Sequence, residues 1–413
     1  MKRTTVVIIG AGQAGLAMSR SLTDRSIDHV LLERGRTAQS WRTERWDSLR
    51  LLTPNWLSRL PSWNYRGDDP DGYMTAVEVA DHLDAYRRSF AAPVITETMV
   101  VSVEATADGF HVETSTGPWS CKAVVVASGA ASNPRIPAIA AGLPAGIVQV
   151  APIHYRNPDQ IGDGGVLVVG PSASGAQIAH ELASAGRDVT MAVGEHVRLP
   201  RTYRGMDIHW WMDAIGQLDE RYDEMGDLVR ARRLPSLQLV GSPSKRDLGL
   251  NELHQAGVDL TGRFVGVAGS KAQFSGSFAN VCASADLKQN RLLDRIDEFV
   301  VETGRGAQHS EPSRPAPTNV PAPPTERALA DFSTVIWATG FKPEYPWLEQ
   351  HLLDRKGAIQ HGGGVMNQPG MYVLGLPFAR RRKSSFLDGV GPDAQYLSQH
   401  LSSHFDHQAA GIH

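Results

Sequence analysis

Short apolar runs alternate with glycine turns and amphipathic segments at the start of the chain. An apolar run at residues 6–9 passes through a glycine turn into a predicted helix at 13–24, and a second apolar run follows at 29–33. Strands that are buried on both faces of a parallel sheet have such continuous apolar runs. This order of strand, helix and strand predicts a βαβ unit.

A second copy of this pattern begins near residue 165. The apolar run 166–169 leads into another glycine turn, a predicted helix that ends near Ala185, and an apolar run at 189–193. A βαβ unit with a glycine turn forms the core of a dinucleotide-binding fold. The duplication therefore predicts an α/β protein with two Rossmann-like dinucleotide-binding domains of the glutathione-reductase-like type, the second inserted in the first.

The segment between the two copies contains a predicted helix and a predicted meander. Apolar side chains recur at helical spacing from Val79 to Phe90, which predicts an amphipathic helix. Apolar and polar residues alternate at 100–104 and 110–114, which predicts antiparallel strands, and a buried run follows at 123–127. We expect this segment to complete the first part of the first domain.

These patterns divide the chain into three segments. We expect the first part of the first domain at 1–158, the second domain at 159–325 and the second part of the first domain at 326–413. The region from about 196 to 290 fits no simple βαβ pattern and is interpreted as an aromatic insert. Six prolines between residues 311 and 325 predict an extended surface linker that returns the chain to the first domain.

Composition and charge exclude several classes of protein. The 413 residues are 41% hydrophobic and 21% charged, as in globular proteins, and the net charge of −3 argues against nucleic acid or an anionic membrane as a partner. The two cysteines, Cys121 and Cys282, form no CxxC pair, and no apolar run reaches the roughly 20 residues that span a bilayer. We expect a cytoplasmic protein, with a homodimer as a possible assembly.

The first glycine turn has the residues that dinucleotide binding requires. In Gly10-Ala11-Gly12-Gln13-Ala14-Gly15, the first two glycines permit a tight turn and the close approach of a pyrophosphate, and the third lets the helix pack on the strand. Glu33 ends the second strand, where a carboxylate accepts hydrogen bonds from an adenosine ribose. The sequence predicts a dinucleotide site here.

The second glycine turn is less regular. Gly170-Pro171-Ser172-Ala173-Ser174-Gly175 has a serine in place of the middle glycine, and serine can still donate to a phosphate. Arg198 and Arg201 follow the second strand, and arginine suits the 2′-phosphate of NADPH. Glu195 could equally bind the ribose of NADH, so both nucleotides stay open on the residues alone.

Taken in order along the chain, these motifs resemble a known family. The first glycine turn with Glu33, the stretches Ser40-Trp41-Arg42 and Trp46-Asp47-Ser48-Leu49-Arg50-Leu51, the second turn and Ala338-Thr339-Gly340-Phe341 are similar to those of the single-component flavin-containing monooxygenases. The resemblance is to bacterial members that are similar to the plant indole-pyruvate monooxygenases. It implies FAD in the first domain, NADPH in the second, and O2 as co-substrate.

The resemblance also implies the type of reaction. Reduced FAD would form a C4a-(hydro)peroxyflavin that oxygenates a small organic substrate at nitrogen, sulfur or a carbonyl group. A reductase that passes electrons from NAD(P)H to a protein partner is the main alternative, and a flavin-binding protein without turnover is a third. The family has a fingerprint between the domains, Phe-x-Gly-x-x-x-His with an aromatic residue four positions later, and this chain lacks it. If Tyr155 is aligned with the aromatic residue, Ala151 falls at the histidine position. If His154 is aligned with the histidine, Val150 falls at the glycine position.

We expect the flavin's reacting atoms to lie near Asn55, a candidate hydrogen-bond donor, although an asparagine after a proline also forms turns. A terminal helix starting near Pro392 could face the flavin with its N-terminus, and by the resemblance Asp388 would bind the ribityl chain. The full set of expected cofactor-binding residues is Gly10, Gly12, Gln13, Ala14, Gly15, Glu33, Arg34, Ser40, Trp41, Arg42, Thr53, Ser128, Gly129, Gly170, Ser172, Ser174, Gly175, Arg198, Arg201, Gly340 and Asp388.

Three further clusters are given simpler interpretations. His400, His404 and His407 share a helix face but lack a carboxylate partner, so we expect a surface patch and no metal site. The run Arg380-Arg381-Arg382-Lys383 is interpreted as a solvated loop, although its proximity to the turn at Asp388 also allows a role near a phosphate or an anionic substrate. The cluster His209-Trp210-Trp211 is assigned either to packing or to a substrate pocket, with no preference between the two.

Overall fold

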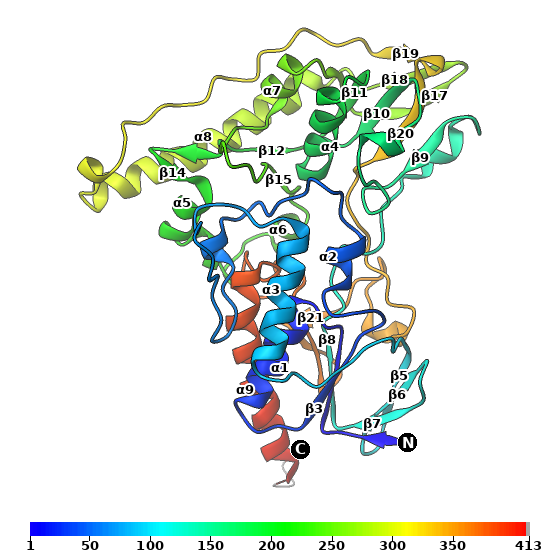
Figure 1. Cartoon of the computed structure of the whole chain (residues 1–413), viewed down its shortest axis with the longest axis vertical. Coiled ribbons are helices and arrows are strands. Elements are labelled where there is room, and N and C mark those ends of the chain that lie inside the picture. Colours follow the sequence, from blue (N-terminus) through cyan, green and yellow to red (C-terminus); the bar gives the residue numbers. More distant parts are fainter. Residues whose placement is uncertain (410–413) are drawn as a thin grey trace.

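Two parallel sheets form the centres of two bodies, one above the other in Figure 1. The structure is a computed structural model that describes residues 1–409. The first body is built on the sheet that contains β2 (Val6–Ile9), and the second body on the sheet that contains β10 (Gly165–Val169). The chain leaves the first sheet after β8 (Ala123–Val126) and returns to it only at β21 (His361–Gly362), so the second body is inserted in the first, as the duplication predicts.

The first sheet has seven strands, and its central strands are parallel. The apolar runs of the first body form neighbouring strands in register, with Ile8 opposite both Leu31 and Val125. In spatial order the strands are β21 (His361–Gly362), β22 (Val365–Met366), β23 (Met371–Val373), β8 (Ala123–Val126), β2, β3 (His29–Leu32) and β4 (Val94–Ile95).

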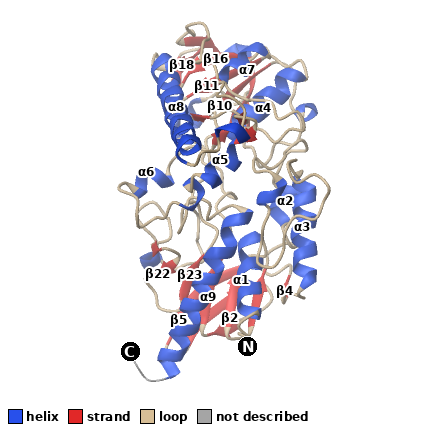
Figure 2. Cartoon of the chain, turned by 90° about the vertical axis from the view of Figure 1, so that its left-hand side faces the viewer, coloured by secondary structure: helices blue, strands red, loops and turns tan. Residues whose placement is uncertain are grey.

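Each face of the first sheet is covered by a different layer, because alternate residues of β2 point to opposite sides. Val6 and Ile8 pack against helices α1 (Gln13–Thr23), α3 (Ala76–Ser89) and α9 (Leu387–Ala409). Figure 2 shows α1 and α9 lying across the strands. Val7 and Ile9 pack against the predicted meander, which is confirmed as β1 (Lys2–Arg3), β7 (Trp119–Cys121), β6 (Gly109–Thr114) and β5 (Val100–Thr106).

The second body repeats this plan around a sheet of five parallel strands. The order is β16 (Asp259–Gly262), β11 (Val189–Val193), β10, β20 (Phe332–Trp337) and β9 (Val148–Val150). Val166 and Val168 face α4 (Ala173–Ser184), α7 (Leu250–Gln255) and α8 (Phe278–Glu302). Leu167 and Val169 face a second antiparallel layer, β17 (Phe264–Ala268), β18 (Lys271–Phe274) and β19 (Glu326–Ala328).

This arrangement corrects the expected domain organisation. Strands β9 and β20 belong to the second sheet, so the exchange between bodies does not fall at the expected boundaries, 158/159 and 325/326. The interpretation of 196–290 as an insert is wrong for α7, β16, β17, β18 and the start of α8, which are parts of the repeated fold. The added region holds β12 (Val197–Arg198), β13 (Thr202–Tyr203), β14 (Met206–Asp207), α5 (Ile208–Ala214), α6 (Leu228–Arg232) and β15 (Leu237–Gln238).

The proline-rich segment 311–325 is extended, as predicted, but it does not return the chain to the first body. It crosses the second body and leads into β19 and β20 (Figure 1). The segment is fastened by Arg198, whose guanidinium donates to Ala316 O and Thr318 Oγ1 and pairs with Asp286 at 2.5 Å. Arg198 is buried, so this ion pair is shielded from water.

Substitution of Arg198 by methionine should release this segment. Loss of the guanidinium leaves Asp286 with only the hydrogen bonds from Thr318 and should lower the free energy of unfolding by roughly 3–5 kcal/mol. Denaturant unfolding measures that loss, and limited proteolysis should show faster cleavage between residues 311 and 325. The control is Lys288→Met, on the helix that carries Asp286. The pair of Lys288 with the exposed Glu195 should contribute less than about 1 kcal/mol. Equal cleavage rates in both variants would contradict the assignment.

Candidate functional site

The first glycine turn joins β2 to α1 and leaves a cradle open at the start of the helix. Gly10 has φ +107°, and a Cβ on it would lie 2.6 Å from Ala127 O. A Cβ on Gly15 would lie 1.9 Å from Gly10 O, so this residue must be glycine for the helix to reach the strand. A Cβ on Gly12 would meet no atom within 4 Å. The cradle therefore fits a pyrophosphate at the free N–H groups of α1.

Glu33 closes one side of this cradle. Its carboxylate accepts hydrogen bonds from the backbone N–H of Ala11 at 2.8 Å and of Gly35 at 3.0 Å. The side chain is buried at the end of β3, where the sequence predicts a ribose contact. The carboxylate and the glycine turn are therefore brought together as expected.

Other expected contacts of the first site lie around α1. Trp41 in α2 (Gln39–Thr43) donates from Nε1 to Gln13 Oε1 at 3.4 Å, which places the indole beside the first turn of α1. Ser128 and Gly129 follow β8 and are exposed, and the Cα of Ser128 lies 3.2 Å from a Cβ placed on Gly10. Further out are Ser40 and Thr53, both half-buried, Arg42, paired with Asp81, and Arg34, paired with Glu44.

The second glycine turn has the same construction. Gly170 has φ +112°, and a Cβ on Gly175 would lie 1.8 Å from Gly170 O. Ser172 begins α4 in the place that Gly12 has at α1, and its side chain makes no capping hydrogen bond, so it is free to bind a ligand. The carbonyl oxygen of Ala338 lies 2.3 Å from a Cβ placed on Gly170, as that of Ala127 does at Gly10. Ala338-Thr339-Gly340 is therefore the equivalent of Ala127-Ser128-Gly129, and Gly340 belongs to the second turn.

The two turns differ at the ribose position. Gly10 N–H donates to Leu32 O at 2.8 Å and Gly170 N–H to Ala192 O at 3.1 Å, so the equivalent of Glu33 is Val193. The second site thus lacks a carboxylate where the first has one. Glu195 comes two residues later and is paired with Lys288 at 2.8 Å.

The expected role of Arg198 and Arg201 at a 2′-phosphate is wrong. Arg198 fastens the proline-rich segment, as described above. Arg201 is fully buried and donates to Leu52 O at 2.8 Å, to Asp207 at 2.6 Å and to His209 Nδ1 at 2.9 Å. Both guanidinium groups are bound within the protein, so neither is free for a nucleotide.

Arg201 belongs to a polar network that joins the two bodies. Asp207 also accepts from Tyr73 of the first body, at 2.6 Å. Burial alone would raise the pKa of Asp207, but the hydrogen bond from His209 and the Arg201 charge lower it to about 2. Burial lowers the pKa of His209, which leaves its ring neutral to accept the Arg201 hydrogen bond. This network holds a fixed charge pair between the bodies.

Asn55 holds a loop of the first body. Its Nδ2 donates to Asp69 O at 2.9 Å, and its Oδ1 accepts from Met74 N–H at 2.7 Å. The side chain is buried, and both ends of the amide bind backbone. This geometry favours the turn-forming alternative, and a donor role of Asn55 near the flavin stays a prediction.

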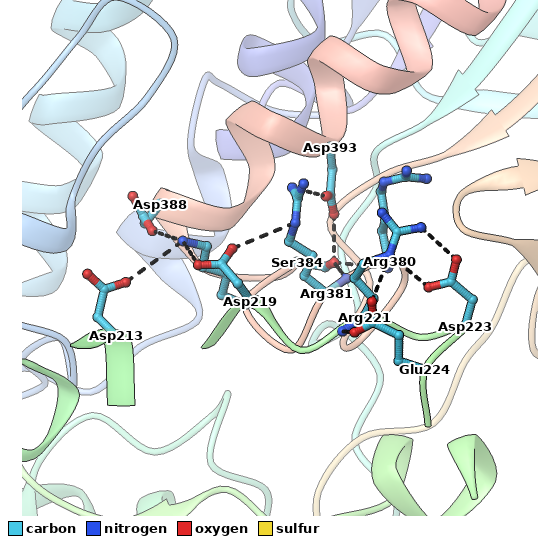
Figure 3. A network of polar contacts seen from close by, with 11 residues as sticks. Asp213, Asp219, Arg221, Asp223, Glu224, Arg380, Arg381, Ser384, Asp388 and Asp393 are labelled. Carbon is cyan, nitrogen blue, oxygen red and sulfur yellow. Dashed lines mark hydrogen bonds and ion pairs between the residues drawn. The ribbon is translucent and has the colours of Figure 1, made fainter. Parts of the chain in front are cut away.

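The start of α9 is the centre of a charged cluster (Figure 3). The helix begins at Leu387, five residues earlier than expected, which puts Asp388 in its first turn. The Asp388 carboxylate is paired with Arg59 at 2.5 Å and with Lys383 at 2.7 Å. The resemblance implies that Asp388 also binds the ribityl chain. In that case its carboxylate would bind the ribityl chain as well as two cations.

The run 380–383 is not a solvated loop. Arg380 and Lys383 are buried, and Lys383 also lies 3.2 Å from Asp219 of the second body. Burial alone would lower the pKa of Lys383, but Asp388 and Asp219 raise it. Burial raises the pKa of Asp213, whose side chain faces the cluster in Figure 3. Arg59 and Asp213 come from distant segments with no shared motif, so sequence reasoning had no signal for them, whereas Lys383 lies in the basic run just before Asp388.

In the cluster His209-Trp210-Trp211, two side chains are packed in the interior and one lines a hollow. His209 and Trp211 are buried in the packing of α5 against α8. Trp210 instead lines a hollow of about 470 Å³ together with Trp56, Met206 and Asp213. This hollow lies between the bodies, beside the charged cluster of α9.

In residues 1–409, His, Cys, Asp and Glu side chains do not gather in threes with the placement that a metal ion needs. Over the same residues, every helix is too short or too polar to cross a membrane.

Comparisons with known proteins agree with this architecture. Residues 7–211 match the family described as pyridine nucleotide-disulphide oxidoreductase. The chain is 32% identical to an uncharacterized CzcO-like oxidoreductase of Geobacillus kaustophilus over 403 residues, which are 97% of this chain and 98% of the relative. It is 27% identical to the indole-3-pyruvate monooxygenase YUCCA4 of Oryza sativa subsp. japonica, over 96% of this chain and 86% of that protein.

A solved structure has the same fold along almost the whole chain. The flavin-containing monooxygenase from Stenotrophomonas maltophilia superposes with a TM-score of 0.67 at 21% identity, covering 98% of this chain and 99% of that one. The two-domain fold and the resemblance inferred from the motifs are confirmed. The chain therefore belongs to the family of the CzcO-like oxidoreductases and is itself an oxidoreductase enzyme.

Proposed function

We propose that the protein is an FAD- and NADPH-dependent monooxygenase that oxygenates a small organic substrate with O2. The observation that carries the proposal is the pair of glycine turns, built alike in one chain but different at the ribose position. Glu33 beside the first turn suits the adenosine ribose of FAD. The uncharged Val193 at the equivalent place in the second turn leaves room for a 2′-phosphate.

The residues around the first turn fit a resident flavin nucleotide. Gly12 leaves space for the pyrophosphate, and the amides of α1 supply its hydrogen bonds. We assign the start of α9 to the flavin ring, because the N–H groups of the helix N-terminus offer partial positive charge there. When bound, reduced flavin would supply the oxygenating C4a-(hydro)peroxyflavin.

The two thiols support oxygen rather than a disulfide as the electron acceptor. Cys121 and Cys282 are buried and unpaired, and they lie in different bodies. Burial raises the pKa of Cys121 to about 12 and that of Cys282 to about 11, so neither forms the thiolate that disulfide exchange needs. The names of the rice and Stenotrophomonas relatives also support a monooxygenase.

Rapid mixing separates the proposal from its alternatives. NADPH should reduce the bound flavin, and mixing the reduced protein with O2 should give a long-lived peroxyflavin absorbance that decays with formation of oxygenated product. Immediate reoxidation without that absorbance would favour a reductase with a protein partner. Failure of NADPH to reduce the flavin would leave only a flavin-binding protein.

Substitutions in the first turn should separate flavin binding from folding. Gly12→Ala adds a methyl group to space that the pyrophosphate needs, so FAD affinity should fall roughly tenfold or more while the thermal unfolding of the apoprotein stays unchanged. Gly15→Ala places its methyl group against Gly10 O and should lower the melting temperature of the apoprotein itself. Fluorescence titration with FAD and calorimetry measure the two effects. Unchanged FAD affinity in Gly12→Ala would refute the assignment.

The choice of nicotinamide nucleotide should depend on Lys288. Removal of this cation by Lys288→Gln leaves Glu195 unpaired beside the second turn, where its charge repels a 2′-phosphate. We expect kcat/KM for NADPH to fall roughly three- to tenfold, with little change for NADH. Lys271→Gln is the matched control, because Lys271 on β18 forms a similar exposed pair with Glu326 on β19. An equal fall for both nucleotides would count against a 2′-phosphate at this position.

A further inference from the structure

A second hollow, of about 360 Å³, lies where the two bodies meet on the side of α4. The first body contributes Ser48 and Arg50, and the second contributes side chains of α4 and of the loop 240–246. The polar residues that line it on the second body include His180, Ser184, Ser242 and Arg246. The described function leaves this hollow without a role.

The loop 240–246 is pressed against the first body beside Arg50. A Cβ on Gly241 would lie 2.2 Å from Leu51 O and 2.9 Å from the Cβ of Arg50. The loop therefore follows any shift of the first body at this point. A ligand in the hollow would touch both bodies at once.

The hollow contains more positive charge than the protein compensates. Arg50 donates to Tyr73 O at 2.8 Å and Arg246 to His180 Nε2 at 2.6 Å, and neither guanidinium forms an ion pair with any carboxylate of the described residues. Burial and the Arg246 charge lower the pKa of His180, so this ring is a neutral acceptor. The one carboxylate in the lining, that of Glu181, accepts a hydrogen bond from Tyr155 at 2.7 Å.

The hollow is separate from the second glycine turn. Its lining on α4 begins at Gln177, a full turn beyond the helix start at Ser172–Ala173. Gln177 donates to Leu239 O at 2.8 Å, and Gln238 donates to Pro171 O at 2.6 Å. The segment 238–239 therefore lies against the glycine turn, and the hollow opens on its far side along α4.

We propose that this hollow binds a phosphate-type oxyanion, either free or carried by a small organic phosphate. Arginine forks bind phosphate oxygens in pairs, and the hydroxyls of Ser48, Ser184 and Ser242 are further donors. An oxyanion bound by Arg50 and Arg246 contacts a guanidinium group of each body at once.

Thermal unfolding of the flavin-loaded protein tests the proposal, with inorganic phosphate as the probe and sodium chloride added to hold the ionic strength constant. Phosphate at about ten times its Kd should raise the melting temperature of the wild type by roughly 1–2 °C. The rise should be lost in Arg50→Gln and in Arg246→Gln. It should persist in Arg233→Gln, an exposed arginine of the same body. The flavin absorbance of each variant checks that it is folded.

Other outcomes would overturn the proposal or identify the source of the phosphate. An equal rise in all four proteins would place the effect elsewhere, and no rise in the wild type would exclude the site. Loss of the rise when adenosine 2′-phosphate is present would assign the phosphate to the nucleotide turn instead. Glycerol 3-phosphate that acts at a lower concentration than inorganic phosphate would indicate an organic ligand, and the reverse order would indicate the free ion.

Discussion

The contact between the third glycine and the first glycine's carbonyl oxygen is the constraint on which both halves of the molecule depend. At Gly15 and at Gly175 a Cβ would lie less than 2 Å from that oxygen, so each helix sits directly on its strand. This contact aims the free amides of α1 and α4 at the carboxyl edge of each sheet. Because the two turns are built alike, the chain offers two sites for dinucleotides, and the different neighbours Glu33 and Val193 give them different preferences.

A two-nucleotide enzyme also needs a defined orientation between its bodies, and here buried charges provide much of it. Arg201 and Asp207 of the second body meet Tyr73 of the first, and Lys383 of the first meets Asp219 of the second. Buried pairs of this kind add little net stability, yet breaking one leaves an uncompensated charge. Polar networks therefore favour one relative orientation more sharply than an apolar contact would.

The sequence predicted those features that depend on local pattern. Continuous apolar runs identified β2, β3, β8, β10 and β11, and alternation identified the meander, because burial of a strand fixes its side-chain pattern. The place of β20 was missed although a signal existed. An apolar run followed by Ala338-Thr339-Gly340 repeats the run followed by Ala127-Ser128-Gly129, and this likeness would have assigned β20 to the second fold.

The errors at the site have a common physical cause. Arg198 and Arg201 were interpreted as phosphate ligands because a cation near a nucleotide motif suits a phosphate. Lys383 was interpreted as part of a solvated loop. In the structure each of these cations is paired with an aspartate of another element: Arg198 with Asp286, Arg201 with Asp207, and Lys383 with Asp388. A long cationic side chain reaches partners that the linear spacing does not reveal, so its role depends on the tertiary fold. Arg50 and Arg246 are different, because neither forms an ion pair with a carboxylate of the described residues, which leaves both guanidinium groups for a ligand.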